Sequence, residues 1–156
     1  MTSHHILAPL DLSEYTEHVF NYLMTFINSL TTRIGTFETH VTLLYVIEKP
    51  DLPGVAESVV ADLLHQPQTW AHRTLEEKYA VQVREAGVEC NTVIESGKPS
   101  QVIVEVARAN QVDMIIMGTH GHSGIPHMML GSVADKVLRL APCPVLVVRP
   151  PRREQP

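Results

Sequence analysis

Apolar residues of this chain gather in five short segments that are separated by longer, more polar stretches. The last two segments are almost continuously apolar, which is typical of strands covered on both faces. Each gap exceeds the dozen or so residues that a crossover between parallel strands needs. The pattern therefore predicts five parallel strands. Their ranges are 5–10, 40–48, 88–96, 113–118 and 144–149.

Helix signals fill the gaps between these strands. A first helix is expected over about residues 13–30, although Thr, Asn and aromatic residues lower its helix propensity. The gap 49–87 contains the turn sequence "DLPG" and a long helical stretch. We expect this stretch to be interrupted near Pro67 and to be closed by Gly87.

The two later helices have clearer boundaries. Pro99 suits the first position of one helix, and Ser132 is the expected N-cap of the other, which Pro142 ends. Apolar residues recur on one face of each helix at the spacing of helical turns. They are Val102, Val106 and Ala109 in the first helix, and Val133, Val137 and Leu140 in the second.

Strands that alternate with helices predict an α/β fold with a mostly parallel sheet. We expect one domain over residues 1–150 and a flexible tail over 151–156. The net charge of −5 argues against general attraction to nucleic acid or to an anionic membrane, and no apolar run approaches the ~20 residues of a membrane span. Cys90 and Cys143 lie outside any C-x-x-C pair, which indicates buried free thiols in a reducing, cytoplasmic setting.

The strongest functional signal is the glycine-rich stretch "MGTHGHSGIPHMMLGS" at 117–132. Glycine lets backbone N–H groups approach an anion closely, and a loop that leaves a strand and enters a helix adds the helix dipole. The stretch therefore favours a phosphate cradle, with the Ser132 hydroxyl as an extra donor. It matches neither G-x-G-x-x-G nor the P-loop pattern with its lysine.

Other interpretations of this stretch remain open. A metal site would use His120, His122 and His127, but no Cys, Asp or Glu joins them. The sequence "THGH" matches a signature of adenylyl-transferring enzymes, but that signature follows the first strand of its fold and this one follows the fourth. A connection that binds nothing is the third alternative, and the position between a strand end and a helix start argues against it.

The glycine spacing G-x2-G-x9-G-[ST] resembles the nucleotide-binding signature of the universal stress protein family. The surrounding segments "ILAPLDLSE", "VTLLYVIE" and "SGKPSQVIVEVA" and the C-terminal third are also similar to that family. The resemblance spans the chain and is weakest over 15–40 and 50–85. The residues that form the signature are Gly118, Gly121, Gly131 and Ser132.

The resemblance implies an open, Rossmann-like sheet of five parallel strands in the order 3-2-1-4-5, with helices on both faces. Strands 1 and 4 are then neighbours whose connections leave in opposite directions, and ligands bind at the carboxyl ends of strands at such a point. The residues that the resemblance assigns to this site are Pro9, Leu10, Asp11, Val46, Met117, Gly118, His120, Gly121, Gly131, Ser132 and Val133.

In these assignments Asp11 accepts hydrogen bonds from ribose hydroxyls, and the backbone of Val46 meets adenine. Residues 117–121 pass under the ribose and phosphates, and residues 131–133 donate N–H groups to the phosphate tail. Each residue also has a purely structural interpretation. Asp11 can cap the first helix together with Ser13, and Val46 and Met117 can be core residues.

The resemblance thus implies a stress-response protein that binds ATP, ADP or AMP and acts as a sensor or regulator. Hydrolysis should be slow or absent, because the loop has no Lys or Arg to stabilise transition-state charge. Mg²⁺ is expected to accompany ATP near Asp11. The alternatives are a nucleotide-independent dimeric module that regulates a protein partner, and an enzyme of the related α-hydrolase-like group.

The last strand, "PVLVVR" at 144–149, should form an edge of the sheet, and the resemblance implies a homodimer through it. The chain departs from nucleotide-binding relatives at His122 and His127, where they usually carry Arg or Lys. Histidine is only partly charged at neutral pH. We therefore expect weaker ATP affinity than in those relatives, rising as the pH falls below ~6.5.

Overall fold

The computed structural model of the protein describes residues 3–34, 38–119 and 130–149. Its strands form one fully parallel sheet in the order β3-β2-β1-β4-β5, which confirms the expected fold. The expected tail, 151–156, lies outside the described residues. The strands are β1 (His4–Pro9), β2 (Thr39–Glu48), β3 (Glu89–Gly97), β4 (Met114–Gly118) and β5 (Val145–Val148).

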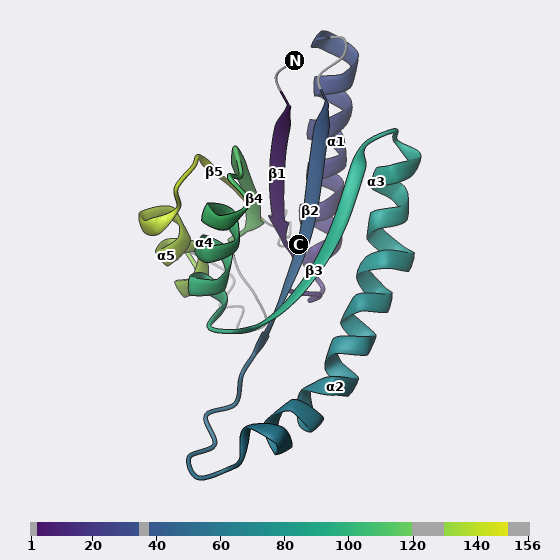
Figure 1. Ribbon diagram of the computed structural model, residues 1–156. Helices are drawn as coiled ribbons and strands as arrows, with labels where there is room; N and C mark the ends of the chain where they lie inside the picture. Colours follow the sequence, from purple (N-terminus) through teal and green to yellow (C-terminus); the bar gives the residue numbers. More distant parts are fainter. Residues whose placement is uncertain (1–2, 35–37, 120–129, 150–156) are drawn as a thin grey trace, which may run out of the picture.

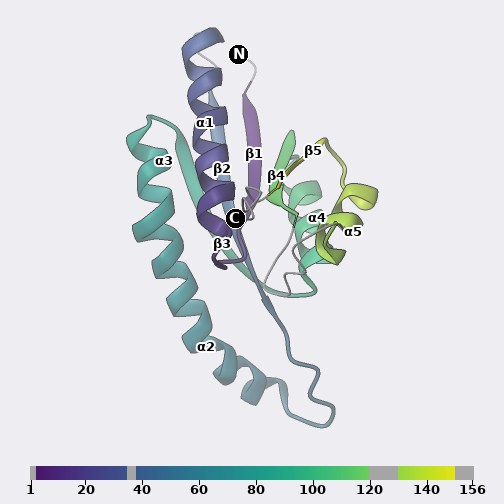
Figure 2. The same ribbon diagram turned by 180° about the vertical axis from the view of Figure 1, so that it is seen from behind.

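Helices cover both faces of this sheet (Figures 1 and 2). On one face lie α1 and the long segment α2–η1–α3, in which η1 is a π-helical stretch. On the other face lie the shorter helices α4 and α5. Their bounds are α1 (Thr16–Ile34), α2 (Glu57–Thr74), η1 (Leu75–Ala80), α3 (Val81–Glu85), α4 (Pro99–Ala109) and α5 (Ser132–Leu140).

Each face of the sheet has its own core, because successive strand residues point to opposite sides. Ile6 of β1 and Ile116 of β4 pack against α1 and α3, whereas Leu7 and Ile115 pack against α4 and α5. Burial on both faces explains why these strands appear in the sequence as continuous apolar runs.

The expected interruption at Pro67 is wrong, because α2 continues through this proline. A proline removes the bond to the carbonyl four residues earlier, here that of Leu63, and α2 is exposed at this point, so water can solvate the freed group. Val60, Leu64 and Ala71 meanwhile hold the opposite side of the helix against the protein. The irregular backbone instead occurs later, in η1.

The closure by Gly87 is confirmed, because this glycine adopts φ 80° and donates to the carbonyl of Arg84 at 2.9 Å. That left-handed conformation suits glycine.

Two details of the short helices differ from expectation. Gly131, not Ser132, is the N-cap of α5, and Ser132 is the first helical residue and is exposed. The apolar faces also end earlier, since Ala109 and Leu140 are exposed in the last turn of their helices. The last turn of each helix therefore lies outside the core, so spacing alone overestimates the buried face. The residues most buried on these helices are Ile103 and Ala107 in α4, and Ala134 and Val137 in α5.

The cysteines differ from each other. Cys90 is buried, and burial raises the pKa of its thiol to about 11, whereas Cys143 is only half-buried. The expectation of two buried thiols therefore holds for Cys90 alone.

β5 lies at an edge of the sheet, as the predicted dimer requires, and the dimer itself stays a prediction. Among the described helices, none is long and apolar enough to cross a membrane.

Candidate functional site

The sheet opens at the carboxyl ends of β1 and β4. These strands pair only at Ile6 with Met114 and Leu7 with Ile115, and they diverge beyond. The chain leaves β1 toward α1 on one face, and it reaches α5 on the other face after β4 (Figure 1). Ligands of open α/β sheets bind at such a point. A cavity of about 440 Å³ lies here.

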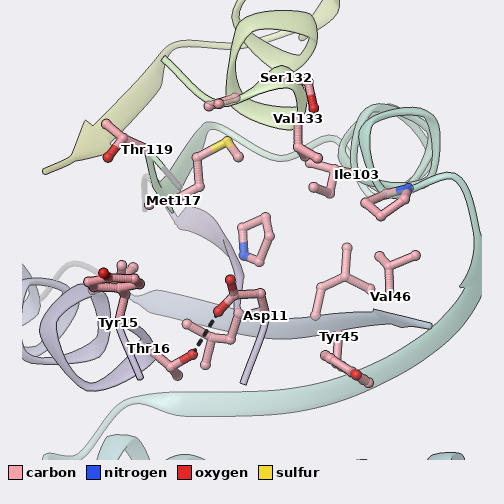
Figure 3. Close-up of a pocket in the computed structure, with 18 of the residues that line it drawn as sticks. Asp11, Tyr15, Thr16, Tyr45, Val46, Ile103, Met117, Thr119, Ser132 and Val133 are labelled. Atoms are coloured by element: carbon pink, nitrogen blue, oxygen red, sulfur yellow. Dashed lines mark hydrogen bonds between the residues drawn. The ribbon is translucent and has the colours of Figure 1, made fainter. Parts of the chain in front are cut away.

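All the predicted site residues that fall within the described part of the chain line this cavity. His120 and Gly121 lie outside the described residues, as do His122 and His127. Figure 3 shows the Asp11 carboxylate near the centre, with Tyr15 on one side, Val46 on the other, and Met117 above. The predicted residues that line the cavity are Pro9, Leu10, Asp11, Val46, Met117, Gly118, Gly131, Ser132 and Val133.

Asp11 is held in place by the turn that leads into α1. Its Oδ1 accepts from the Ser13 backbone N–H at 3.0 Å, from the Ser13 hydroxyl at 2.7 Å and from the Thr16 hydroxyl at 3.0 Å. The Ser13 hydroxyl oxygen in turn accepts from the Tyr15 N–H at 3.2 Å. This network forms the turn before the helix, which explains why α1 begins at Thr16 and not near residue 13. The capping interpretation of Asp11 is therefore correct in part, and it leaves the carboxylate in the cavity wall.

Leu12 adopts the left-handed conformation, with φ 56°. A branched side chain in this region is strained by about 1–2 kcal/mol. Leu12 packs its side chain against the core under α1, which stabilises the strained turn. Strained backbone that the surroundings enforce is frequent at functional sites. Here it lies directly after Asp11, which lines the cavity.

The strand β2 extends past its neighbour at the cavity. β1 ends at Pro9, opposite Leu44, and the Leu10 N–H donates to the Leu44 carbonyl at 2.8 Å. The backbone N–H and C=O of Leu44 therefore point toward β1, and those of Val46 point the same way because alternate residues of a parallel strand share this direction. No residue of β1 lies opposite Val46. Its peptide groups consequently face the cavity.

The glycine-rich loop is fixed at both ends. The Thr119 N–H donates to the Val148 carbonyl at 3.1 Å, and the Gly131 N–H donates to the Thr119 carbonyl at 2.8 Å. These bonds bring the end of β4 next to the first turn of α5. The N–H groups at the start of α5 therefore face the cavity, which Ser132, Val133 and Ala134 line.

Gly131 has an extended backbone, with φ −60° and ψ 152°, that any residue can adopt. This backbone conformation therefore does not by itself require glycine at the N-cap, where Ser, Thr, Asp or Asn would cap the helix with a side chain. No side-chain cap is present. The absence of a side chain keeps the first-turn N–H groups accessible from the cavity.

Sequence reasoning missed several lining residues, among them Tyr15, Tyr45, Glu48, Ile103 and Thr119. Burial, together with the nearby carboxylates of Asp11 and Glu48, raises the pKa of Tyr45, so its phenol stays protonated and can donate a hydrogen bond. Tyr15 and Tyr45 carry no local motif. Thr119 lies inside the glycine-rich stretch, and its position directly after β4 was the signal that could have identified it.

The described walls have an apolar and a polar part. Val46 and Ile103 form an apolar wall, whereas Asp11 and the start of α5 provide acceptors and donors. Charged side chains among the described lining residues are the carboxylates of Asp11 and Glu48. A site of this kind accommodates a flat apolar group at one end and hydroxyls or an anion at the other.

The family model that matches the chain is that of the universal stress protein family, and it covers residues 2–149. The protein belongs to this family. It is similar to the universal stress protein MJ0531 of Methanocaldococcus jannaschii, with 33% identity over 118 residues, 76% of this chain and 69% of that protein.

Solved structures agree with this membership. The structure of MJ0577 from the same archaeon superimposes with a TM-score of 0.81 at 29% identity, covering 96% of this chain and 98% of that one. UspA from Lactobacillus plantarum gives a TM-score of 0.77 at 23% identity, covering 94% and 97% of the two chains, and shows the same fold.

Proposed function

We propose that the protein binds an adenine nucleotide in the cavity at the carboxyl ends of β1, β2 and β4. The observation that carries this proposal is that one cavity joins the strand-end residues, the exposed peptide groups of Val46 and the uncapped start of α5. A universal stress protein family member from Arabidopsis thaliana, 19% identical with a TM-score of 0.64, was crystallised with AMP bound, so the fold accommodates this ligand class.

The base would lie against the apolar wall. The side chains of Val46 and Ile103 offer apolar contact to the base. The Val46 peptide offers one N–H donor and one C=O acceptor on the side where β1 has ended. Adenine presents an acceptor and an amino donor side by side on one edge, which matches such a pair. The backbone of Val46 thereby supplies specificity without a dedicated polar side chain.

The ribose and phosphates would follow toward α5. Asp11 accepts only, so it favours hydroxyl donors such as those of ribose. Phosphate oxygens favour the N–H groups and the positive dipole end of α5. Mg²⁺ brought with ATP would reduce repulsion between the phosphates and the carboxylates of Asp11 and Glu48. The charged side chains of the described walls are carboxylates, so they cannot stabilise the negative charge that develops in the transition state of phosphate hydrolysis. A sensor or regulator with slow hydrolysis therefore fits better than an efficient ATPase.

Calorimetric titration with ATP, ADP and AMP, with and without Mg²⁺, tests this proposal. We expect a Kd near or below ~10 μM, which corresponds to about −7 kcal/mol. The decisive variant is Gly131→Asp, because it caps α5 and adds a negative charge where phosphate would bind. Affinity should fall at least about tenfold while the helix stays stable. Gly131→Asn is the matched control, since it caps α5 without the charge and should lose less affinity.

Two outcomes would overturn the proposal. One is no binding by wild-type protein that is free of co-purified nucleotide, which would favour a nucleotide-independent module that regulates a protein partner. The other is equal affinity of the wild type and Gly131→Asp, which would place the phosphates elsewhere. Chromatography of the nucleotide after long incubation tests the accompanying expectation of slow or absent hydrolysis.

A further inference from the structure

Two carboxylates line the cavity of the proposed nucleotide site from different strands. Asp11 follows β1, and Glu48 is the last residue of β2. Burial is the main cause that raises the pKa of Tyr45, and the charges of Asp11 and Glu48 raise it further. Both carboxylates therefore act on the same side chain of the cavity wall, so the negative potential belongs to the cavity as a whole and not to one residue.

Side chains that could balance these carboxylates are scarce. The described lining residues include no Lys, Arg or His. Lys49 and Lys98 are neighbours of lining residues in the sequence, but both are exposed and neither lines the cavity. The sequence between Met117 and Ser132 contains no Lys or Arg, and its histidines are mostly neutral at pH 8. Phosphate groups in this cavity therefore depend on backbone donors.

The first turn of α5 suits one phosphate group better than several. The Asp135 N–H donates to the Gly131 carbonyl at 2.9 Å, which is the first hydrogen bond of the helix. The N–H groups of Ser132, Val133 and Ala134 come before it and have no partner within the helix. They correspond in number to the terminal oxygens of a single phosphate group. The helix dipole adds a positive potential equivalent to only about half an elementary charge.

Each further phosphate adds negative charge that the described walls do not balance. ADP and ATP bring more of this charge than AMP does, into a cavity with two carboxylates and a chain whose net charge is −5. The ion pairs among the described residues do not include Glu48. Repulsion between like charges is stronger in a partly enclosed cavity than in bulk water, because the effective dielectric constant is lower.

We propose, on the basis of the nucleotide site proposed above, that this cavity selects nucleotides by charge and binds AMP more tightly than ADP or ATP. A divalent cation on the phosphates removes most of the preference, because it neutralises the added charge. Glu48 is a specificity-determining residue in this arrangement, whereas Asp11 binds the ribose that all three nucleotides share. The preference is therefore a property of the walls of this cavity and can be changed by one substitution.

Calorimetric titration at pH 8, with EDTA and at low salt, tests the proposal. AMP should bind at least about tenfold more tightly than ATP, with ADP between them. Excess Mg²⁺ should bring the Kd values of AMP and ATP to within about threefold of each other. Raising NaCl from about 20 mM to about 500 mM should also narrow the difference, because salt screens repulsion. A site that held the phosphates with cationic side chains would respond in the opposite direction, since ATP would lose more affinity than AMP.

The Glu48→Lys variant tests whether a carboxylate of the cavity causes the preference. It should lower the Kd of ATP relative to that of AMP at least about fivefold. Glu85→Lys is the matched control, because Glu85 is exposed at the end of α3, near the amino ends of the strands and away from the cavity (Figure 1). It makes the same change in net charge and should leave the ratio of the two Kd values nearly as in the wild type.

Three results would overturn the proposal. ATP that binds as tightly as AMP at pH 8 without metal would refute selection by charge and leave the nucleotide site itself standing. Equal effects of Glu48→Lys and Glu85→Lys would show that the net charge of the protein, and not its cavity, causes the preference. No binding of any of the three nucleotides would refute the proposed function together with this inference.

Discussion

The α4–α5 side and the α2–α3 side of the sheet solve the same packing problem differently. On the α4–α5 side, two short helices cover the central strands, and their residues share a continuous core with Leu7 and Ile115. On the other side, the long segment α2–η1–α3 runs along β2 and β3 and contains a proline and a π-helical stretch. Its first half packs through a small core of Ile47, Val60 and Leu64.

This difference has a physical consequence. A large continuous core holds the first turn of each helix in a defined position. A binding site formed by those first turns needs this precision. A helix held by a small core tolerates irregular backbone and keeps much of its surface exposed. We therefore associate the α4–α5 side with the candidate ligand site, which the first turn of α5 lines.

The largest expected effect compares the two cores. Ile115→Ala removes a fully buried side chain from the core under α4 and α5 and should lower the free energy of unfolding by roughly 4 kcal/mol. Leu64→Ala lies in the small core under α2 and should cost about 2 kcal/mol, since water can reach the space left behind. Urea unfolding measures both values. Equal losses would show that the α2 side is as tightly packed as the other.

Next in size is the effect of the proline in α2. Pro67→Ala restores a backbone N–H and removes the ring from a helix interior, so unfolding should require up to about 3 kcal/mol more. Gln68→Ala is the control at an exposed neighbour and should shift stability by less than about 0.5 kcal/mol. A less stable Pro67→Ala variant would mean that α2 needs the proline to reach its position.

Acid should affect the two sides at different pH. Burial is the main cause that lowers the pKa of His5. Its ring forms hydrogen bonds with Thr42 Oγ1 at 2.8 Å and with the Asn110 carbonyl at 3.2 Å, and it lies edge-on to His40. The unfolded chain then binds the proton more readily, so stability is complete above about pH 6.5 and falls as the pH drops below it. The His5→Gln variant should lose most of this change in stability with pH.

Glu76 of η1 loses its contribution only at lower pH. Hydrogen bonds from Arg84 and Thr92 lower the pKa of its carboxyl, so the stabilisation is present above about pH 4.5 and is lost as the pH falls through the lowered value. Urea midpoints measured between pH 7 and 3 separate the two steps. A Glu76→Gln variant that alters the step near pH 6 would contradict this assignment.

The smallest expected effect links the two sides. Tyr45 lines the cavity and also touches Trp70 on α2. Nucleotide bound in the cavity should therefore change the emission of Trp70 slightly. Tyr45→Leu should remove most of this change while binding persists in the calorimeter. An identical signal in both proteins would show that Trp70 responds by another route.

Much of the fold was predictable because its signals are local. Strands buried on both faces need continuous apolar runs, and Pro99 and Gly87 mark a helix start and a helix end at the residues where the structure has them. The course of α2 through Pro67 was not predictable, because it depends on water around that turn and on the contacts of Val60 and Leu64 on the other side.

The candidate site likewise has residues that the sequence indicates and residues that only the structure reveals. The glycine spacing and the strand-end positions were readable from the sequence, and the described members line one cavity. Tyr15, Thr16 and Tyr45 were not, since nothing near them in the chain indicates what they meet. Their roles follow from the turn that Asp11 organises and from the register of β1 against β2.

The sequence by itself determined the alternation of strands and helices, the family and the glycine pattern between β4 and α5. These features depend on neighbouring residues and on spacing along one chain. Only the tertiary structure decided that β1 ends before β2, so that the peptide of Val46 faces a cavity, and that one side of α2 stays exposed. Both depend on which distant elements end beside each other, and the free energy of such contacts is absent from any local pattern.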